Sequence, residues 1–249
     1  MASKGASDGS RVTGDGSPVV VITGASQGIG AAIACAFAGV EGARLALLAR
    51  SADKLEAVAA ECRARGAEAE GFVCDVTDDA AVAQAAERVA ARFGTADVLV
   101  NNAGLFRPGP LLETTPEAFR EQVEVNLTSA FLVTRAFLPP MLAAGRGHVF
   151  FLASVASLRA YPGGAAYGAA KHGLLGLARG VREETRERGI RVTALLPGAT
   201  YTPSWEGVEV PRERLMPAED VAQAVLDAWS LSDRSVVEEI ILRPQLGDL

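Results

Sequence analysis

The chain has 249 residues, 49% of them hydrophobic, and a formal net charge of −6 at pH 7. This length fits one large α/β domain or two small ones, and an acidic chain without a cluster of lysine and arginine excludes nucleic acid as an expected partner. No apolar run is expected to cross a membrane. The three cysteines, Cys35, Cys62 and Cys74, are widely spaced and have neither metal nor redox spacing, so we expect a cytoplasmic protein without a metal site.

Short apolar runs alternate with helical patterns after residue 17. The apolar runs predict strands at residues 18–22, 43–49, 69–74, 97–100, 148–153, 190–196 and 236–242, and the helical patterns cover residues 29–38, 53–65, 79–93, 116–141, 163–188 and 217–231. This alternation predicts an α/β fold: a single doubly wound Rossmann domain over residues 18–249, with a mostly parallel seven-stranded sheet and helices on both faces. Residues 1–17 are rich in Gly, Ser and Asp and lack the apolar centre of a signal peptide, so we expect a disordered tail.

The first strand enters its helix through a glycine turn, Gly24-x3-Gly28-x-Gly30. Backbone N–H groups and the positive end of the helix dipole converge at such a turn, which suits a phosphate group. Gly24 allows the tight turn, Gly28 lets the backbone approach a pyrophosphate, and Gly30 lets the helix sit close to the sheet. Three glycines alone also fit an ordinary turn. The cofactor contacts predicted here are Gly24, Ser26, Gln27, Gly28, Ile29 and Gly30.

Arg50 directly follows the second strand, where a dinucleotide fold carries either an acid for a ribose 2′-hydroxyl or a cation for a 2′-phosphate. A guanidinium suits the phosphate, so NADP(H) is favoured over NAD(H); the alternative is a solvated arginine at the start of a loop. The ends of the third and fourth strands add an Asp-Val pair that could meet an adenine, although Asp after a strand is usually a helix cap, and Asn101-Asn-Ala-Gly104, whose asparagines can tie adjacent strand ends together. The contacts predicted in this region are Arg50, Ser51, Asp75, Val76, Asn102, Ala103 and Gly104.

Tyr167 and Lys171 lie four residues apart on a predicted helix and therefore on one face of it. A nearby ammonium is expected to lower the pKa of the tyrosine from its ordinary value near 10 and so to tune it for proton transfer to or from a carbonyl oxygen. Tyr-x3-Lys is also common on ordinary helix surfaces. Ser154, at the end of the fifth strand, is placed to hydrogen-bond the same oxygen. Asn126 is a polar residue in an apolar helix and needs a partner; it is either part of the site or a satisfied, helix-bending asparagine.

Six motifs in this order resemble the short-chain dehydrogenase/reductase family over essentially the whole chain after residue 17. They are Thr23-Gly-x3-Gly-Ile-Gly30, Asn101-Asn-Ala-Gly104, Asn126, Ser154, Tyr167-x3-Lys171 and Pro197-Gly198. The resemblance implies an enzyme that uses a nicotinamide cofactor to reduce the carbonyl group of a small substrate to an alcohol.

The resemblance also implies a role for each matching residue. Tyr167 would be the general acid, Ser154 would polarise the carbonyl, and Asn126 would position a water that relays protons to Lys171. Lys171 would also hold the ribose hydroxyls of the nicotinamide. The cofactor contacts implied after the sixth strand are Pro197, Gly198, Thr200 and Thr202, the last two for the carboxamide.

The end of the chain lacks the Val-Asp/Asn-Gly-Gly motif of the fatty-acid-synthesis reductases and most resembles the bacterial sepiapterin reductase branch and the related hydroxy-acid dehydrogenases. Sepiapterin or a related pterin or diketone is therefore the leading substrate. Tyr161 and Trp205 are candidates for an aromatic slot, or they simply pack a lid. Glu206 or Glu209 could pair with the guanidine-like edge of a pterin, or be solvated charges.

Two alternatives remain open at this point. A 3-oxoacyl or 3-hydroxy-acid oxidoreductase would need a cationic or carrier-binding site that the sequence does not reveal, and a non-catalytic NADP-binding regulator should have lost Ser154, Tyr167 or Lys171, which are all present. By analogy with the family, we expect a homodimer or homotetramer.

Overall fold

A computed structural model describes residues 17–205, 207 and 209–248 of the chain. The predicted tail at 1–17 thus lies outside the described residues except for Ser17, as does Glu206. Seven parallel strands form one sheet in the order β3-β2-β1-β4-β5-β6-β7. The predicted doubly wound Rossmann fold is confirmed, and the sheet is parallel throughout.

The strands and helices follow the predicted alternation. The strands are β1 Val19–Thr23, β2 Arg44–Ala49, β3 Glu68–Val73, β4 Val98–Asn101, β5 Gly147–Leu152, β6 Ile190–Pro197 and β7 Glu239–Leu242. The α-helices are α1 Gly28–Phe37, α2 Ala52–Ala64, α3 Asp79–Phe93, α4 Pro116–Val123, α5 Ser129–Ala144, α6 Ala165–Thr185 and α7 Ala218–Ser230. The last strand begins three residues later than predicted.

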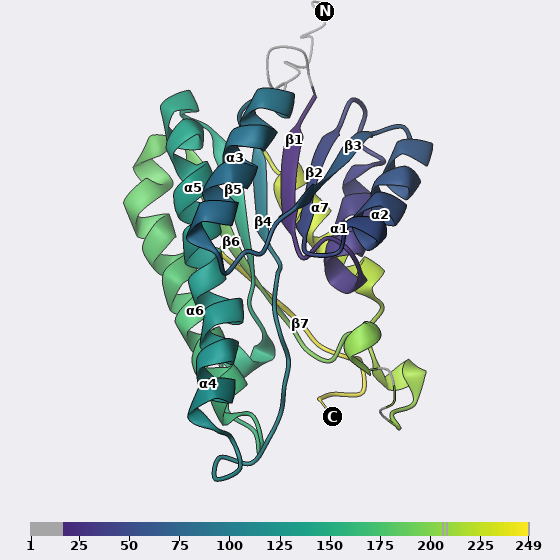
Figure 1. Cartoon of the computed structure of the whole chain (residues 1–249), viewed down its shortest axis with the longest axis vertical. Helices are drawn as coiled ribbons and strands as arrows, with labels where there is room; N and C mark the ends of the chain where they lie inside the picture. The colour runs from purple at the N-terminus through teal and green to yellow at the C-terminus, as the bar shows by residue number, and fades with distance from the viewer. Residues whose placement is uncertain (1–16, 206, 208, 249) are drawn as a thin grey trace, which may run out of the picture.

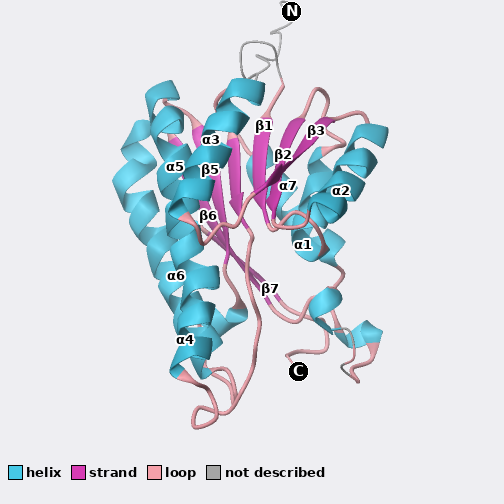
Figure 2. Cartoon of the chain, in the orientation of Figure 1, coloured by secondary structure: helices cyan, strands magenta, loops and turns pink. Residues whose placement is uncertain are grey.

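Helices cover both faces of the sheet, as the apolar strands require. Helices α1, α2 and α7 lie on one side, and α3, α4, α5 and α6 lie on the other (Figure 1). Figure 2 shows the strands between these two groups. Each face has its own core: Ile22, Phe37 and Val225 belong to the first, and Leu99 and Phe151 to the second. Of the three free cysteines, Cys62 and Cys74 are buried and Cys35 is partly buried.

The helix predicted from residue 116 is interrupted. A π-helical turn, Glu124–Thr128, separates α4 from α5 and contains the buried Asn126. The continuous stretch Pro116–Ala144 has an 18-residue window of mean hydropathy 1.3, so on length and composition alone it could span a membrane, contrary to our expectation. The core helix of a folded domain passes the same test. Here α5 packs against β4, β5 and α3, which identifies it as a helix of this domain.

The order of the strands reverses between β1 and β4. The connection that follows β1 crosses one face of the sheet, and the connection that follows β4 crosses the other. In an open parallel sheet, ligands bind outside the carboxyl ends of the strands at such a point. The carboxyl ends of β1, β4, β5 and β6 carry the glycine turn, the Asn101–Gly104 motif, Ser154 and the Pro197-Gly198 pair. The topology therefore brings these predicted motifs to one edge of the sheet.

Candidate active site

A cavity of about 840 Å³ lies at this edge. It is lined by the residues predicted from the sequence, with one exception: Gly24, Ser26, Gln27, Gly28, Ile29, Arg50, Ser51, Asp75, Val76, Asn102, Ala103, Gly104, Asn126, Ser154, Tyr161, Tyr167, Lys171, Pro197, Gly198, Thr200, Thr202 and Trp205. The exception is Gly30, which lies beneath the turn. These residues, up to 181 positions apart in the chain, thus meet around one cavity.

The glycine turn has the conformation that its composition predicts. Gly24 and Gly28 have φ angles of 63° and 57°, in the left-handed region that favours glycine. A Cβ atom on Gly30 would lie 2.4 Å from the carbonyl oxygen of Gly24, so only glycine lets α1 start this close to β1. A Cβ on Gly28 would meet the side chain of Thr202 at 3.2 Å. The segment after β6 therefore lies directly over the turn.

Asn102 ties β4 to the glycine turn. Its Nδ2 donates to the carbonyl oxygens of Thr23 and Gly24 at 2.9 and 3.2 Å, and the Thr23 hydroxyl accepts from the backbone N–H groups of Asn102 and Ala103. This is the link between strand ends that the motif predicted. Asn101 points elsewhere, because its Nδ2 donates to the hydroxyl of Thr134 on α5.

Two cations stand beside the turn at the carboxyl end of β2. Arg50 lines the cavity, and so does Lys54, which sequence reasoning missed; its Nζ donates to Oε1 of Gln27 at 3.0 Å. Asp75 lies across from Arg50, but one of its carboxylate oxygens accepts from the backbone and the hydroxyl of Thr77 at 3.0 and 2.7 Å. These hydrogen bonds, more than the Arg50 charge, lower the pKa of Asp75. Asp75 therefore forms a local turn with Thr77, and the cap of α3 that was weighed for Asp75 is Asp78.

Tyr167, Ser154 and Lys171 lie together where β5 meets α6. Ser154 follows β5 and is buried, its Oγ accepts from the backbone N–H of Ala156 at 3.1 Å, and it lies close enough to Tyr167 to lower the pKa of that residue. The ammonium of Lys171 is buried 5.7 Å from the centre of the Tyr167 ring and donates to the carbonyl oxygen of Leu152 at 2.7 Å. The hydroxyl of Ser157 donates to the carbonyl oxygen of Lys171 at 2.8 Å and so attaches α6 to the end of β5. Ser157 is a positioning residue that the motifs did not reveal.

The expected lowering of the tyrosine pKa is wrong for this structure. Burial raises the pKa of Tyr167 to about 12, and the neighbouring Ser154 side chain opposes this only in part. Burial also lowers the pKa of Lys171 to about 8, because desolvation disfavours its charged form. Spacing on the helix placed the two groups correctly, but the sequence carries no measure of the desolvation that dominates both pKa values.

Asn126 is fully hydrogen-bonded within the protein. Its Nδ2 donates to the carbonyl oxygens of Leu105 and Gln122 at 2.8 and 2.9 Å, and its Oδ1 accepts from the backbone N–H of Leu105 at 3.1 Å. These contacts are those of the satisfied, helix-bending asparagine, and they brace the segment after Gly104. A Cβ on Gly104 would meet both Oδ1 of Asn126 and Nζ of Lys171, at 3.0 and 3.6 Å. The role of Asn126 in a proton relay stays a prediction.

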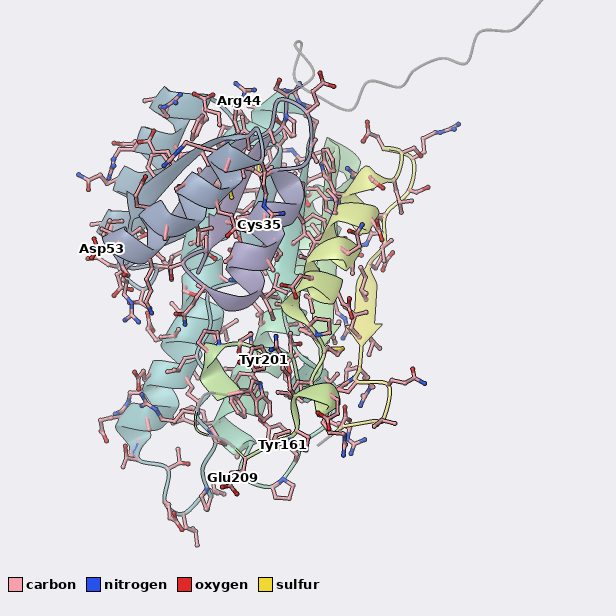
Figure 3. All side chains as sticks on the ribbon, turned by 90° about the vertical axis from the view of Figure 1, so that its right-hand side faces the viewer. Cys35, Arg44, Asp53, Tyr161, Tyr201 and Glu209 are labelled. Carbon is pink, nitrogen blue, oxygen red and sulfur yellow. The ribbon has the colours of Figure 1, made fainter. Side chains whose placement is uncertain are left out.

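The outer part of the cavity is where the substrate would lie, and its walls come from three segments. Phe106 meets the Tyr167 ring edge-on at a centroid distance of 5.0 Å. Tyr161 and Trp205 complete the aromatic lining, while Glu209 is exposed and does not line the cavity (Figure 3). Sequence reasoning missed four further charged residues that line the cavity, Glu121, Glu124, Arg159 and Asp248.

Arg159 and Asp248 form a charged pair at this wall. Their side chains approach within 3.9 Å, and the Asp248 carboxylate is also paired with Arg243. Neither residue belongs to a motif. Only the folding of the last residues back toward the 3₁₀ turn after β5 brings them together.

Comparisons with known proteins agree with this geometry. A family model described as short chain dehydrogenase matches residues 18–212. The chain is 40% identical to the sepiapterin reductase of Chlorobaculum tepidum, over 93% of this chain and 98% of that protein. Among solved structures, an alcohol dehydrogenase from Thermococcus sibiricus complexed with 5-hydroxy-NADP superposes with a TM-score of 0.85 at 36% identity, covering 92% of this chain and 97% of that one. An actinorhodin polyketide ketoreductase variant with NADPH has a TM-score of 0.86 at 30% identity, covering 96% of this chain and all of that one.

Proposed function

The chain belongs to the short-chain dehydrogenase/reductase family and is an NAD(P)-dependent oxidoreductase acting on CH–OH groups; from this premise we propose that it uses NADPH to reduce a carbonyl group of a small, flat substrate such as sepiapterin or a related diketone. The observation that carries the proposal is the meeting of Ser154, Tyr167 and Lys171 beside the aromatic wall of the cavity. The predicted catalytic set is complete, which speaks against a non-catalytic regulator.

The cavity residues fit a phosphorylated dinucleotide. Gly24 and Gly28 hold the left-handed φ angles of the turn that a pyrophosphate would approach, and Arg50 and Lys54 would hold a 2′-phosphate. Thr202, over the glycine turn, would hold the carboxamide, whereas the hydroxyl of Thr200 already donates to the carbonyl oxygen of Gly198 at 3.0 Å. The bound cofactor supplies the hydride, and the protein supplies position and charge.

We expect Arg50→Ala to raise the KM for NADPH by about 10- to 100-fold, because a hydrogen bond to a charged group contributes roughly 1.5–3 kcal/mol. The KM for NADH should change little, since that cofactor has no 2′-phosphate. Steady-state kinetics with both cofactors tests this, with Arg120→Ala on α4, outside the cavity, as the matched control. A wild-type enzyme that prefers NADH, or an unchanged KM for NADPH in the variant, would contradict the assignment.

The proton chemistry follows from the pKa directions. A tyrosine with a pKa near 12 is protonated at neutral pH, which is the form required of a general acid. Ser154, which lines the same cavity, would donate to the same carbonyl oxygen and stabilise the negative charge that develops there. The reverse reaction needs the tyrosinate as a base, which burial disfavours. The buried tyrosine is therefore in the protonated form that the proposed reduction requires.

The aromatic lining supports a flat substrate. Phe106, Tyr161 and Trp205 offer ring faces and edges on which a bicyclic ring could stack. The guanidine-like edge of a pterin would pair with a carboxylate. Of the carboxylates that line the cavity, Asp75, Glu121, Glu124 and Asp248, we propose Asp248, whereas Glu209 does not line the cavity. The similarity to a sepiapterin reductase supports the same substrate class.

A second candidate, reduction of a 3-oxo acid or 3-oxoacyl thioester, is favoured by one observation. Arg159 supplies the cation in the cavity wall that such a substrate needs and that the sequence did not reveal. Its guanidinium is 69% exposed and 3.9 Å from Asp248, so a substrate carboxylate could take the place of that partner. The similarity to a polyketide ketoreductase agrees with this reading.

The test is NADPH oxidation with sepiapterin, a neutral diketone, a 3-oxo acid and a 3-oxoacyl thioester, for the wild type and for Asp248→Asn and Arg159→Gln. We expect sepiapterin to be reduced and its KM to rise about tenfold in Asp248→Asn, with little change in Arg159→Gln. Turnover of the 3-oxo acid that depends on Arg159 instead would establish the second candidate. NADPH binding without oxidation by any of these compounds would overturn the proposal.

The predicted homodimer or homotetramer and the cytoplasmic location remain proposals. Phe119 on α4 and Phe131 on α5 are 42% and 47% exposed, on the helices that commonly pair across a two-fold axis in the family. Such exposed aromatic side chains fit burial against a second copy.

A further inference from the structure

We propose that the protein carries a second anion-binding site, for an oligophosphate group, at the amino ends of β4, β5 and β6. A separate cavity of about 440 Å³ lies there, between the starts of these strands and the segment after α7. Because all strands of the sheet are parallel, their amino ends lie at the opposite end of the sheet from the catalytic cavity. In Figure 3, Arg44, at the start of β2, lies near the top of the molecule, and Tyr201, after the end of β6, lies well below it.

Five arginines line this cavity in a chain whose net charge is −6: Arg146, Arg182, Arg186, Arg191 and Arg234. They come from three separate parts of the chain, namely the start of β5, the end of α6 with the start of β6, and the turn after α7. Only two aspartates, Asp97 and Asp233, line this cavity. The fold therefore gathers positive charge in a concave site where the chain as a whole is acidic, and guanidinium groups match phosphate oxygens through paired N–H donors.

The arginines are held at different depths. The Arg191 side chain is only 13% exposed, and its guanidinium donates to the carbonyl oxygens of Trp229 and Leu231 at 3.3 and 3.1 Å, at the end of α7. The Nε of Arg146 donates to Asp97 at 3.1 Å. These two residues are structural and fix the wall. Arg186 and Arg234 are exposed, and within the part of the chain that the structure describes Arg234 has no ion-pair or hydrogen-bond partner.

The acidic partners around the cavity are weak competitors for these arginines. Arg182 pairs with Glu238 and Arg186 with Glu183, both of which are 61% exposed, and Asp233 is 79% exposed and 3.8 Å from Arg191. Exposed ion pairs of this kind contribute little to stability, so an anion with several charges can displace them. The one buried acid, Asp97, is already engaged by Arg146 and by the backbone N–H of Val19.

A guanidinium has five N–H donors, and the ion pairs of Arg182 and Arg186 with their acidic partners engage one nitrogen of each guanidinium. Donors on three side chains, including Arg234, thus remain for a ligand with several acceptor oxygens. A single phosphate uses few of them, whereas a diphosphate or triphosphate matches the number of guanidiniums and the volume. Trp229, half buried in the same wall, could additionally stack a nucleotide base. The shared chemistry is the oligophosphate, whether free or part of a nucleotide.

The experiment measures thermal unfolding of the full chain and calorimetric binding with sodium pyrophosphate, ATP or adenosine. NADP⁺ is present at a concentration just sufficient to occupy the catalytic cavity, and sodium chloride at equal ionic strength is the reference. We expect pyrophosphate at about ten times its Kd to raise the melting temperature by about 3 °C, ATP to do the same, and adenosine to have no effect. A stronger effect of ATP than of pyrophosphate would identify a nucleotide as the source.

The matched variants separate this site from the catalytic one. Arg186→Ala/Arg234→Ala removes the two exposed cations and should weaken pyrophosphate binding at least about tenfold. Arg188→Ala removes an exposed arginine in the same turn that does not line the cavity, and Arg50→Ala weakens only the catalytic cavity; both should retain the binding. No stabilisation of the wild type, or stabilisation that persists in the double variant or is lost in Arg50→Ala, would overturn the proposal. None of these readouts depends on which substrate the enzyme reduces.

Discussion

Tyr167→Phe should lower kcat by about 10²- to 10⁴-fold, the range that a positioned general acid contributes, while NADPH continues to bind. The substitution removes one hydroxyl and keeps the aromatic ring that packs against Phe106 at 5.0 Å. The cavity wall is therefore preserved, and only the proton donor is lost. Stopped-flow NADPH oxidation, with cofactor binding followed separately by fluorescence, measures the two effects independently.

The matched control is Tyr201→Phe. Tyr201 is exposed, lies in the segment after β6 and stacks under Arg212, but it does not line the cavity. The control loses the same hydroxyl near the same site and should keep wild-type turnover. If Tyr167→Phe retained more than about a tenth of the wild-type kcat, the tyrosine would be a binding residue, and the proton would have to come from another donor.

The fold could be predicted because strands are indicated by patterns within short segments of the sequence. All five residues of β1 are buried, and their unbroken apolar run is what a strand covered on both faces requires. The same reasoning placed Arg50 and Ser154 correctly, since each follows a strand and all carboxyl ends of a parallel sheet share one edge. Each of these predictions depends only on the residues of one short segment, and the sequence shows all of those residues.

Features that depend on contacts between distant segments escaped prediction. The π-helical turn around Asn126 exists because that side chain hydrogen-bonds Leu105, 21 residues away. Arg159 and Asp248 are 89 residues apart and belong to no motif. The pKa of Tyr167 depends on burial that only the assembled cavity produces. Local pattern thus placed the proposed catalytic residues at one end of the sheet, whereas the wall of the proposed substrate site required the structure.

Gly30→Ala is expected to destabilise the domain by about 1–3 kcal/mol, the usual cost of forcing an extra methyl group into a packed site. The added Cβ would lie 2.4 Å from the carbonyl oxygen of Gly24 and 2.5 Å from Nδ2 of Asn102. Both atoms belong to the network that joins the glycine turn to β4, and the first is backbone, so neither can move aside without displacing the turn. The KM for NADPH should therefore rise together with the loss of stability.

Gly180→Ala is the control that makes this result specific. Gly180 is an exposed residue inside α6, and a Cβ there would meet nothing within 4 Å. The same substitution should stabilise the protein by about 0.5–1 kcal/mol, because alanine loses less backbone entropy in a helix. Thermal unfolding should move the two variants in opposite directions, by roughly 2–4 °C per kcal/mol for a chain of this size. If Gly30→Ala unfolded like the wild type with an unchanged KM for NADPH, the close approach of α1 to β1 would not be what shapes the cofactor site.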